Sequence, residues 1–222
     1  MTFAAKPIER SESLAARVYS EIERMILAGE MQPGSRIKEA VLAEQMAVSR
    51  APVREATRAL VEAGLLVSIP ARGVFVREMS PREIAENYDV RSLLTGLICA
   101  QAAERRTSAD IAKLKRLIAD MDTAIAAGRI ARYYEINLAF HELIGSIASH
   151  SCAHRVYNDL IRETHFLRRS VSSPGQTNQE HRSIVEAIER GDVELARRRG
   201  LEHVLNGKAR WKASVDTAAA AT

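Results

Sequence analysis

The stretch from Ile37 to Val76 constrains the fold of this chain more than any other, because it holds a complete supersecondary pattern. It reads IKEAVLAEQMAVSRAPVREATRALVEAGLLVSIPARGVFV. A short amphipathic segment over 39–46 is followed by a break at Ala47-Val48, and Ser49 then opens a second helix as its N-cap. Gly64 suits the C-terminal end of that helix. Two short helices joined by a tight turn predict a helix-turn-helix.

A β-hairpin is predicted directly after the second helix. Residues 65–69 and 74–76 are apolar runs of strand-forming residues, and Pro70-Ala71-Arg72-Gly73 separates them. Before the motif, Ser13 can cap a further helix over 14–28, and residues 1–12 are expected to be a flexible tail. The sequence therefore predicts a winged helix-turn-helix domain over residues 13–78.

Basic side chains gather at the start of the second helix and at the hairpin tip. Arg50 and Arg54 are four residues apart, so they share one helix face, and each guanidinium can grip a guanine or clamp a phosphate. Arg72-Gly73 can reach the minor groove, because glycine permits close approach of the backbone. Residues 48–77 hold 5 Lys or Arg against 2 Asp or Glu. This local excess favours binding of double-stranded DNA over a solvated helix whose arginines pair with its two glutamates.

The chain beyond Ser80 shows only helical patterns. Ser80-Pro81 is typical of a helix start, and helices are predicted over 81–106, 108–127, 129–149, 151–171, 175–190 and 192–210. Short connections favour antiparallel neighbours in a bundle. Residues 211–222 are expected to form a frayed tail. The predicted fold class is mainly α: an N-terminal winged helix-turn-helix, then an all-helical antiparallel bundle domain over 79–210.

Three of the six histidines lie on apolar stripes of predicted bundle helices: His141, His181 and His203. Asn137 lies one turn before the first of them, so an amide oxygen can join the same site. Neutral imidazole is the commonest protein metal ligand, and three imidazoles with one oxygen leave open positions on a zinc, nickel or manganese ion. The alternative is that each histidine is a satisfied core residue. The remaining histidines are expected at surface or loop positions without a role: His150, His154 and His165.

Arg91 lies on the apolar stripe of the first bundle helix, together with Tyr88, Thr95 and Ile98. A buried cation without an anionic partner suffers a large desolvation penalty. One interpretation is that Arg91 clamps the carboxylate of a small organic acid, the effector, bound beside the metal. The other is a salt bridge within the bundle or across a subunit interface, and the sequence leaves both open.

The cysteine count, the N-terminal sequence and the absence of certain motifs limit the classes of protein to which this chain can belong. Cys99 and Cys152 form no CxxC, which indicates a reduced, cytoplasmic setting. The N-terminus lacks the apolar core of a signal peptide, and no apolar run is long enough to span a bilayer, so no membrane partner is expected. No phosphate loop or nucleophile elbow occurs, so no catalytic residue is assigned. A net charge of +4 suits a nucleic-acid partner without proving one.

Several short motifs occur together in residues 14–76: Pro33-Gly34, Leu42-Ala43-Glu44, Val48-Ser49-Arg50, Pro52-Val53-Arg54-Glu55-Ala56, Gly64-Leu65 and Arg72-Gly73. They resemble the winged-helix domain of the GntR family of bacterial transcription regulators. The resemblance implies operator contacts from the recognition helix and from the wing. The candidate DNA-binding residues are Ser49, Arg50, Pro52, Arg54, Arg72 and Gly73.

A second set of motifs follows between residues 82 and 208: Tyr88-Asp89-Val90-Arg91, Asn137-Leu138-Ala139-Phe140-His141, Glu180-His181-Arg182-Ser183-Ile184 and His203. They resemble the ligand-sensing FCD domain of the FadR branch of that family. Many such domains bind a divalent metal through an acidic residue and three histidines. The ligands implied here are Asn137, in place of the more usual aspartate, with His141, His181 and His203.

The resemblance implies a metabolite-responsive regulator, commonly a repressor that its effector releases from DNA. We expect a homodimer, because one short helix reads too few base pairs for genomic specificity. Two other functions remain open from the sequence. One is a metal-dependent hydrolase or lyase in the bundle, and the other is a DNA-binding protein whose helical domain only dimerises.

Overall fold

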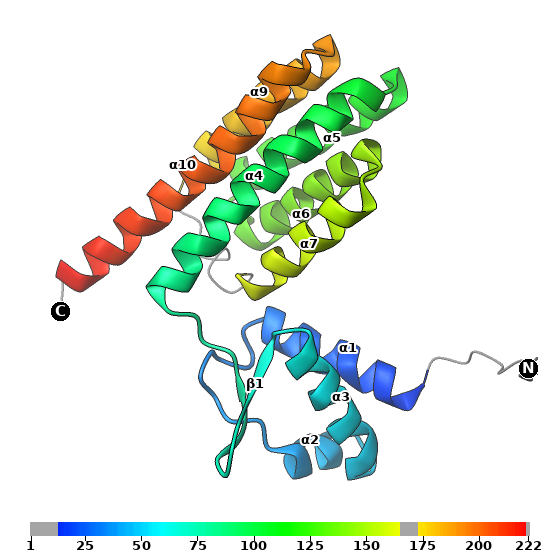
Figure 1. Cartoon of the computed structure of the whole chain (residues 1–222), viewed down its shortest axis with the longest axis vertical. Coiled ribbons are helices and arrows are strands. Elements are labelled where there is room, and N and C mark those ends of the chain that lie inside the picture. The colour runs from blue at the N-terminus through cyan, green and yellow to red at the C-terminus, as the bar shows by residue number, and fades with distance from the viewer. Residues whose placement is uncertain (1–12, 165–172, 221–222) are drawn as a thin grey trace, which may run out of the picture. The chain divides into compact units, whose positions relative to one another are not determined.

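The structure, a computed structural model, describes residues 13–164 and 173–220 (Figure 1). Contacts within the chain divide it into two compact units, residues 1–78 and 79–222. The first unit is a winged helix-turn-helix and the second is all-helical, so the predicted fold class is confirmed. The predicted tail over 1–12 lies outside the described residues.

The first unit holds three helices and a two-stranded wing among its described residues: α1 Leu14–Leu27, α2 Glu39–Gln45, α3 Arg50–Glu62, β1 Leu66–Ile69 and β2 Gly73–Val76. Apolar residues spaced three or four apart on α1 and α3 meet in its core, which contains Val18, Ile22, Ile26, Val53, Ala56 and Leu60. Val41 of α2 is exposed, and Leu42 and Ala43 carry the contact of α2 with the core.

Two tight turns set the geometry of the motif. Ala47 adopts φ 52° between α2 and α3, and the amide of Val48 donates to the carbonyl of Ala43 at 2.9 Å. In the wing, β1 and β2 are antiparallel with Ile69 opposite Gly73, and Gly73 has φ 109°, a conformation that favours glycine. The first turn thus fixes the direction in which α3 begins, and the second forms the tip of the wing.

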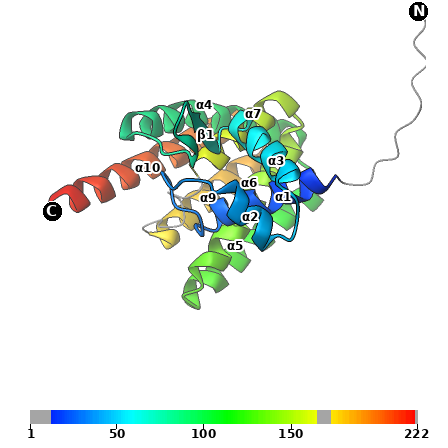
Figure 2. The same cartoon turned by 90° about the horizontal axis from the view of Figure 1, so that it is seen from below.

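The second unit is a bundle of α4 Pro81–Arg105, α5 Ser108–Ala126, α6 Ile130–Ala148, α7 Ser151–Glu163, α9 Pro174–Arg190 and α10 Val193–Ala220. Figure 1 shows its helices running side by side, and Figure 2 shows α4 and α10 extending toward the same side. Reciprocal side-chain and backbone hydrogen bonds between Ser80 and Glu83, and between Thr107 and Asp110, begin α4 and α5. Phe140, Leu114, Met121, Ile184 and Ile188 are among the fully buried side chains of the core.

Small residues let α4 and α10 pack closely. A Cβ atom added at Gly200 of α10 would lie 2.8 Å from the Cys99 sulfur and 2.9 Å from the Thr95 carbonyl oxygen of α4. The Thr95 carbonyl belongs to the backbone of α4 and cannot retreat without moving that helix, so a side chain at Gly200 would push α4 and α10 apart. The close approach brings the next turn of α10, which carries His203, into the interior of the bundle.

Two predicted boundaries were wrong. The helix predicted over 151–171 ends at Glu163, and residues 165–171 lie outside the described part of the chain. The frayed tail predicted over 211–222 is instead a continuation of α10 to Ala220, while residues 221–222 are not described. Trp211 packs on the ring of Tyr88, with centroids 6.0 Å apart, and this tertiary contact together with helix-forming alanines extends the helix. Among the described residues, no helix has the length and apolar character needed to cross a membrane.

Candidate functional site

Three buried histidines from different helices meet inside the bundle. His141 comes from α6, His181 from α9 and His203 from α10, and their exposed fractions are 7%, 0% and 7%. One nitrogen of each lies within 4.8 Å of the others. The structure therefore brings together the three histidines that the sequence singled out, which are far apart along the chain.

A carboxylate orients one member of the cluster. The Nδ1 atom of His203 lies 2.8 Å from an oxygen of Glu180, and the guanidinium of Arg210 donates to both oxygens of that carboxylate, at 2.7 and 3.1 Å. Burial raises the pKa of the Glu180 carboxyl, but the hydrogen bonds from His203 and Arg210 outweigh it and lower the pKa to about 2. The ionised carboxylate can only accept, so Nδ1 carries the proton and Nε2 is left for a metal.

The side-chain amide of Asn178 lies beside the Nδ1 atom of His181, as the carboxylate of Glu180 lies beside that of His203. The Nδ1 atom of His181 lies 3.4 Å from the side-chain oxygen of Asn178. Asn178 is held in turn, because its amide nitrogen donates to the Ile118 carbonyl at 3.2 Å and to Asp122 at 2.7 Å. Partners on the Nδ1 side are typical of histidines that coordinate through Nε2.

Asn137 supplies an oxygen one turn before His141 on α6. Its side chain is 4% exposed, and its amide oxygen has no hydrogen-bond partner among the residues that the structure describes. A buried acceptor without a donor is rare and calls for an explanation, such as a bound ion. Three imidazoles and this oxygen are a donor set that fits a divalent cation of the zinc, nickel or manganese type.

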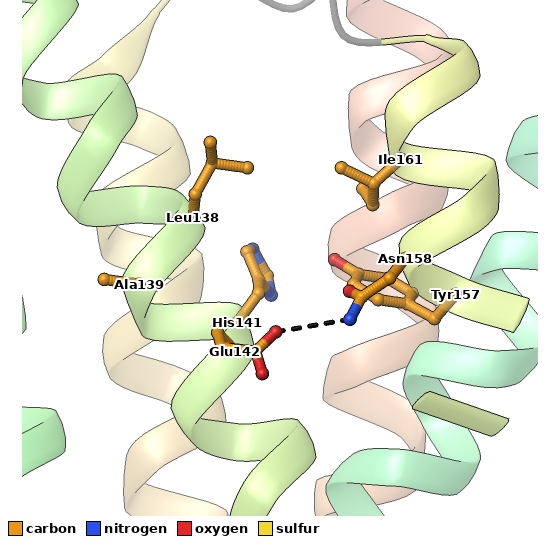
Figure 3. A pocket seen from close by; sticks show the side chains of 7 residues that line it. All are labelled: Leu138, Ala139, His141, Glu142, Tyr157, Asn158 and Ile161. Atoms are coloured by element: carbon orange, nitrogen blue, oxygen red, sulfur yellow. Dashed lines mark hydrogen bonds between the residues drawn. The ribbon is translucent and has the colours of Figure 1, made fainter. Parts of the chain in front are cut away.

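A pocket of about 310 Å³ opens beside this cluster, between α6 and α7 (Figure 3). Its lining consists of Leu138, Ala139, His141, Glu142, Tyr157, Asn158 and Ile161. The amide of Asn158 donates to Glu142 at 3.3 Å across the gap, as the dashed line in Figure 3 marks. The volume suits a small ligand, and His141 joins the pocket to the histidine cluster.

Two of the histidines without an expected role have structural ones. His154 lies on α7 with 18% of its side chain exposed, pairs with Glu142 at 3.0 Å, and packs where Gly145 of α6 leaves room. His150 caps α7 by accepting from the amide of Ala153 at 3.2 Å. His165 lies outside the described residues.

Arg91 is buried on α4, with 3% of its surface exposed. Its guanidinium lies over the ring of Tyr88, 4.6 Å from the centroid, and donates to the hydroxyl of Thr164 at 3.1 Å. Arg91 does not line the 310 Å³ pocket. Thr95, one turn later on α4, lines a small cavity of about 10 Å³ together with His141, so this face of α4 lies toward the histidine cluster.

In the first unit, the start of α3 presents its candidate residues to the exterior. Ser49 occupies the N-cap position without a capping hydrogen bond from its side chain, and Arg50 and Arg54 are exposed. Pro52, half-buried, sits in the first turn, where a missing N–H costs nothing. Nε of Arg54 lies 3.6 Å from Glu39 of α2, which steadies an otherwise exposed side chain.

The wing presents the other two candidates. Arg72 is exposed at the tip, with its guanidinium 5.8 Å from the centroid of the Phe75 ring. Gly73 begins β2 directly beside it. The structure thus places the six candidate DNA-binding residues within one unit, at the N-terminal end of α3 and at the end of the wing.

Sequence reasoning missed Glu180, Asn178 and Glu39 as positioning residues. Glu180 is adjacent to His181 in the sequence but hydrogen-bonds His203 from another helix. Glu39 reaches Arg54 and Thr57 across the turn of the motif. The contacts of Glu180 and Glu39 join separate helices, so no spacing along the chain signals them, whereas Asn178 lies one turn before His181 on α9 itself.

Two family models match the chain. Residues 14–76 match "Bacterial regulatory proteins, gntR family", and residues 86–206 match "FCD domain". The two matches fall in the two units of the structure, and the second alone covers more than half of the chain.

Similar proteins are bacterial regulators. An uncharacterized HTH-type transcriptional regulator, YdhC of Bacillus subtilis, is 28% identical over 190 residues, covering 83% of this chain and 85% of its own. A probable D-xylose utilization operon transcriptional repressor of Paenarthrobacter nicotinovorans is 28% identical over 207 residues, covering 92% and 91%. The HTH-type transcriptional repressor RspR of Escherichia coli is 25% identical over 192 residues, covering 85% and 84%.

Solved structures share the fold. E. coli McbR/YncC superposes with a TM-score of 0.78 at 24% identity, covering 92% of this chain and 100% of that one. A putative GntR transcriptional regulator from Rhodococcus sp. RHA1 superposes with a TM-score of 0.74 at 22% identity, covering 90% and 97%. At these identities the likeness concerns the fold alone.

Proposed function

The chain belongs to the GntR family of bacterial regulatory proteins and carries an FCD domain, and we propose that it is a metal-dependent, metabolite-responsive repressor. As a member of this family it is a DNA-binding transcription regulator and not an enzyme. The proposal concerns the finer points: the metal, the effector, the operator contacts, the dimer and the direction of the response. A repressor of this kind works in the cytoplasm, where bacterial DNA is found.

The observation that carries the proposal is the convergence of the three histidines, with the buried oxygen of Asn137, which has no hydrogen-bond partner among the described residues, one turn before His141 on α6. In our proposal His141, His181, His203 and Asn137 hold one divalent ion. When bound, the ion supplies positive charge and open coordination positions for a carboxylate oxygen. Asn137 is neutral and Arg210 compensates the charge of Glu180, so the carboxylate behind His203 acts by fixing the imidazole with Nε2 free and by raising its basicity as a ligand.

The effector of the proposal is a small organic acid that occupies the pocket between α6 and α7. Its carboxylate faces His141, and its apolar part contacts Leu138, Tyr157 and Ile161. Arg91 remains a proposed effector-binding residue, because it places a buried positive charge one turn from Thr95, which faces the cluster. The observed contacts of Arg91 with Tyr88 and Thr164 would hold its guanidinium in place until an acid arrives.

The proposed DNA contacts come from Ser49, Arg50, Pro52 and Arg54 on α3, and from Arg72 and Gly73 on the wing. An effector changes repression only if it binds more tightly to one arrangement of the two DNA-binding units than to the other. We propose that the acid-bound form has the lower affinity for the operator.

A thermal-shift screen tests the metal and the effector together. The full-length chain is loaded with zinc, nickel or manganese, or treated with a chelator, and small carboxylic acids are added. An acid at about 100 times its Kd stabilises the folded state by about 2.7 kcal/mol, which raises the Tm by about 5–10 °C. We expect this shift only in the metal-loaded protein.

The variant His181→Gln is the control for the screen, because it keeps a polar side chain of similar length but removes a ligand. It should melt normally without metal and show no acid-dependent shift. If the parent chain retains no metal and no acid changes its Tm, the helical domain serves dimerisation alone and the effector proposal fails.

The proposed homodimer rests on exposed apolar residues of α4. Val90 and Leu93 are 48% and 66% exposed, and three residues apart on a helix they form one patch. Leu93→Asp should raise the dimer dissociation constant by about 100-fold or more, since it places like charges opposite each other in a symmetric interface. Light scattering over a concentration series measures this change.

Leu205→Asp is the matched control, because Leu205 is an exposed leucine (38%) of α10 in the same unit. It should leave the molar mass unchanged. A Leu93→Asp variant with the mass and concentration dependence of the parent would exclude this face of α4 from the interface.

A further inference from the structure

The extended segment before α2 lies alongside strand β2 of the wing. Arg36 forms an antiparallel bridge with Phe75 of β2. The amide of Ile37 donates to the Val74 carbonyl at 2.8 Å. Residues 34–37 are therefore tied to the wing by backbone hydrogen bonds, although they lie far before it in the sequence.

Side chains alternate along this extended edge. Ile37 is buried in the core of the unit, whereas Arg36 and Lys38 are exposed on the opposite side. They border a hollow of about 380 Å³ between the wing and the start of α2, lined by Arg36, Ile37, Lys38, Glu39, Ala40, Gly73 and Val74. The alternation thus places two cations on one rim of a surface depression.

The guanidinium of Arg36 rests on the bare backbone of Gly73. A Cβ atom at Gly73 would lie 3.2 Å from Nε and 3.3 Å from a terminal nitrogen of Arg36, so a side chain at this position would crowd the guanidinium. The contact holds the charge of Arg36 against the wing, next to Arg72.

The two cations are not neutralised within the described part of the unit. Neither Arg36 nor Lys38 forms an ion pair with a described residue. Glu39 is the one acid among the residues that line the hollow, and its oxygens face Arg54 at 3.6 Å and Thr57 at 3.2 Å instead. The hollow therefore offers uncompensated positive charge to an anionic partner.

We propose that Arg36 and Lys38 bind phosphates of the DNA backbone beside the wing. Arg36 offers a planar fork that matches a phosphate, and Lys38 adds a point charge two residues along. Contacts of this type position a protein on a duplex without reading its bases. This inference rests on the proposed DNA contacts of α3 and the wing. It adds a third segment, residues 36–38, that binds the DNA backbone, and we call this contact the clamp.

The salt dependence of binding tests the clamp. Full-length parent, Arg36→Gln, Lys38→Gln and the double variant are titrated onto two duplexes, one of arbitrary sequence and one selected by the parent from a random library. Each lost phosphate contact lowers the slope of log K against log salt by about 0.9. Each substitution removes one contact from both subunits of the proposed dimer, so we expect a loss of about two units per substitution and about four in the double variant, with equal weakening on both duplexes.

Two matched variants separate charge from structure. Arg36→Lys keeps the charge and should keep most of the slope, while Arg17→Gln removes an exposed arginine of α1 and should leave the slope unchanged. Thermal melting checks that each variant folds.

An unchanged slope in the folded double variant overturns the proposal. So does a loss confined to the selected duplex, since that would mean base reading by these residues. If the parent binds neither duplex, the DNA contacts proposed for α3 and the wing fail together with the clamp, and this outcome is distinct from the previous two.

Discussion

Replacing Arg54 by alanine is expected to weaken binding to a selected operator duplex by about 10- to 100-fold, or about 1.4–2.8 kcal/mol, as for the loss of one bidentate base contact. Arg54 is exposed on the first turns of α3, and Glu39 is the group that steadies its guanidinium. The substitution also leaves Glu39 uncompensated near the phosphates, which adds to the loss. Fluorescence anisotropy with the labelled duplex at fixed salt measures the change.

Two variants sharpen this test. Arg58→Ala removes an exposed arginine one turn farther along α3, away from the N-terminal end, and should cost clearly less affinity. Arg54→Lys keeps the charge but loses the planar fork, so it should bind with intermediate affinity. Arg54→Ala protein that binds the duplex as tightly as the parent would show that Arg54 makes no operator contact.

His181→Ala should lower the affinity for a divalent metal by more than about 100-fold. Loss of a supporting partner behind a ligand costs about 10–100-fold, and loss of the ligand itself costs more. His181 is fully buried and stands next to both other imidazoles, with ring centroids 5.3 Å from His141 and 4.7 Å from His203. Metal content after dialysis, measured by mass spectrometry, reports the loss.

Removal of a buried imidazole also opens a cavity beside Phe140, whose ring centroid lies 4.6 Å from that of His181. His181→Gln, which fills more of the space, separates the loss of a ligand from the loss of packing. His154→Gln is the matched control, because this histidine pairs with Glu142 outside the cluster and should leave the metal content unchanged. A His181→Gln protein that holds metal at the parental stoichiometry would refute the ligand set.

Local patterns in the sequence predicted most of the helices. Ser80-Pro81 marked the start of α4, and the predicted ranges placed the ends of several bundle helices within one or two residues of those observed. Capping and turn chemistry act between neighbours in the chain, so they can be read from it. The boundaries that failed depend on distant contacts: α10 continues past residue 210 because Trp211 finds Tyr88 on α4.

By itself, the sequence determined the winged helix-turn-helix, the helical bundle and the side chains that carry the chemistry, because periodicity, caps and residue types are local properties. Only the tertiary structure decided that three histidines meet, that Glu180 orients His203 and not its neighbour, and that Arg36 rests on Gly73. These contacts join residues more than 20 positions apart. These contacts form because the helices pack at particular distances and angles, which positions such as Gly200 determine. The spacing of residues along the chain does not give those distances.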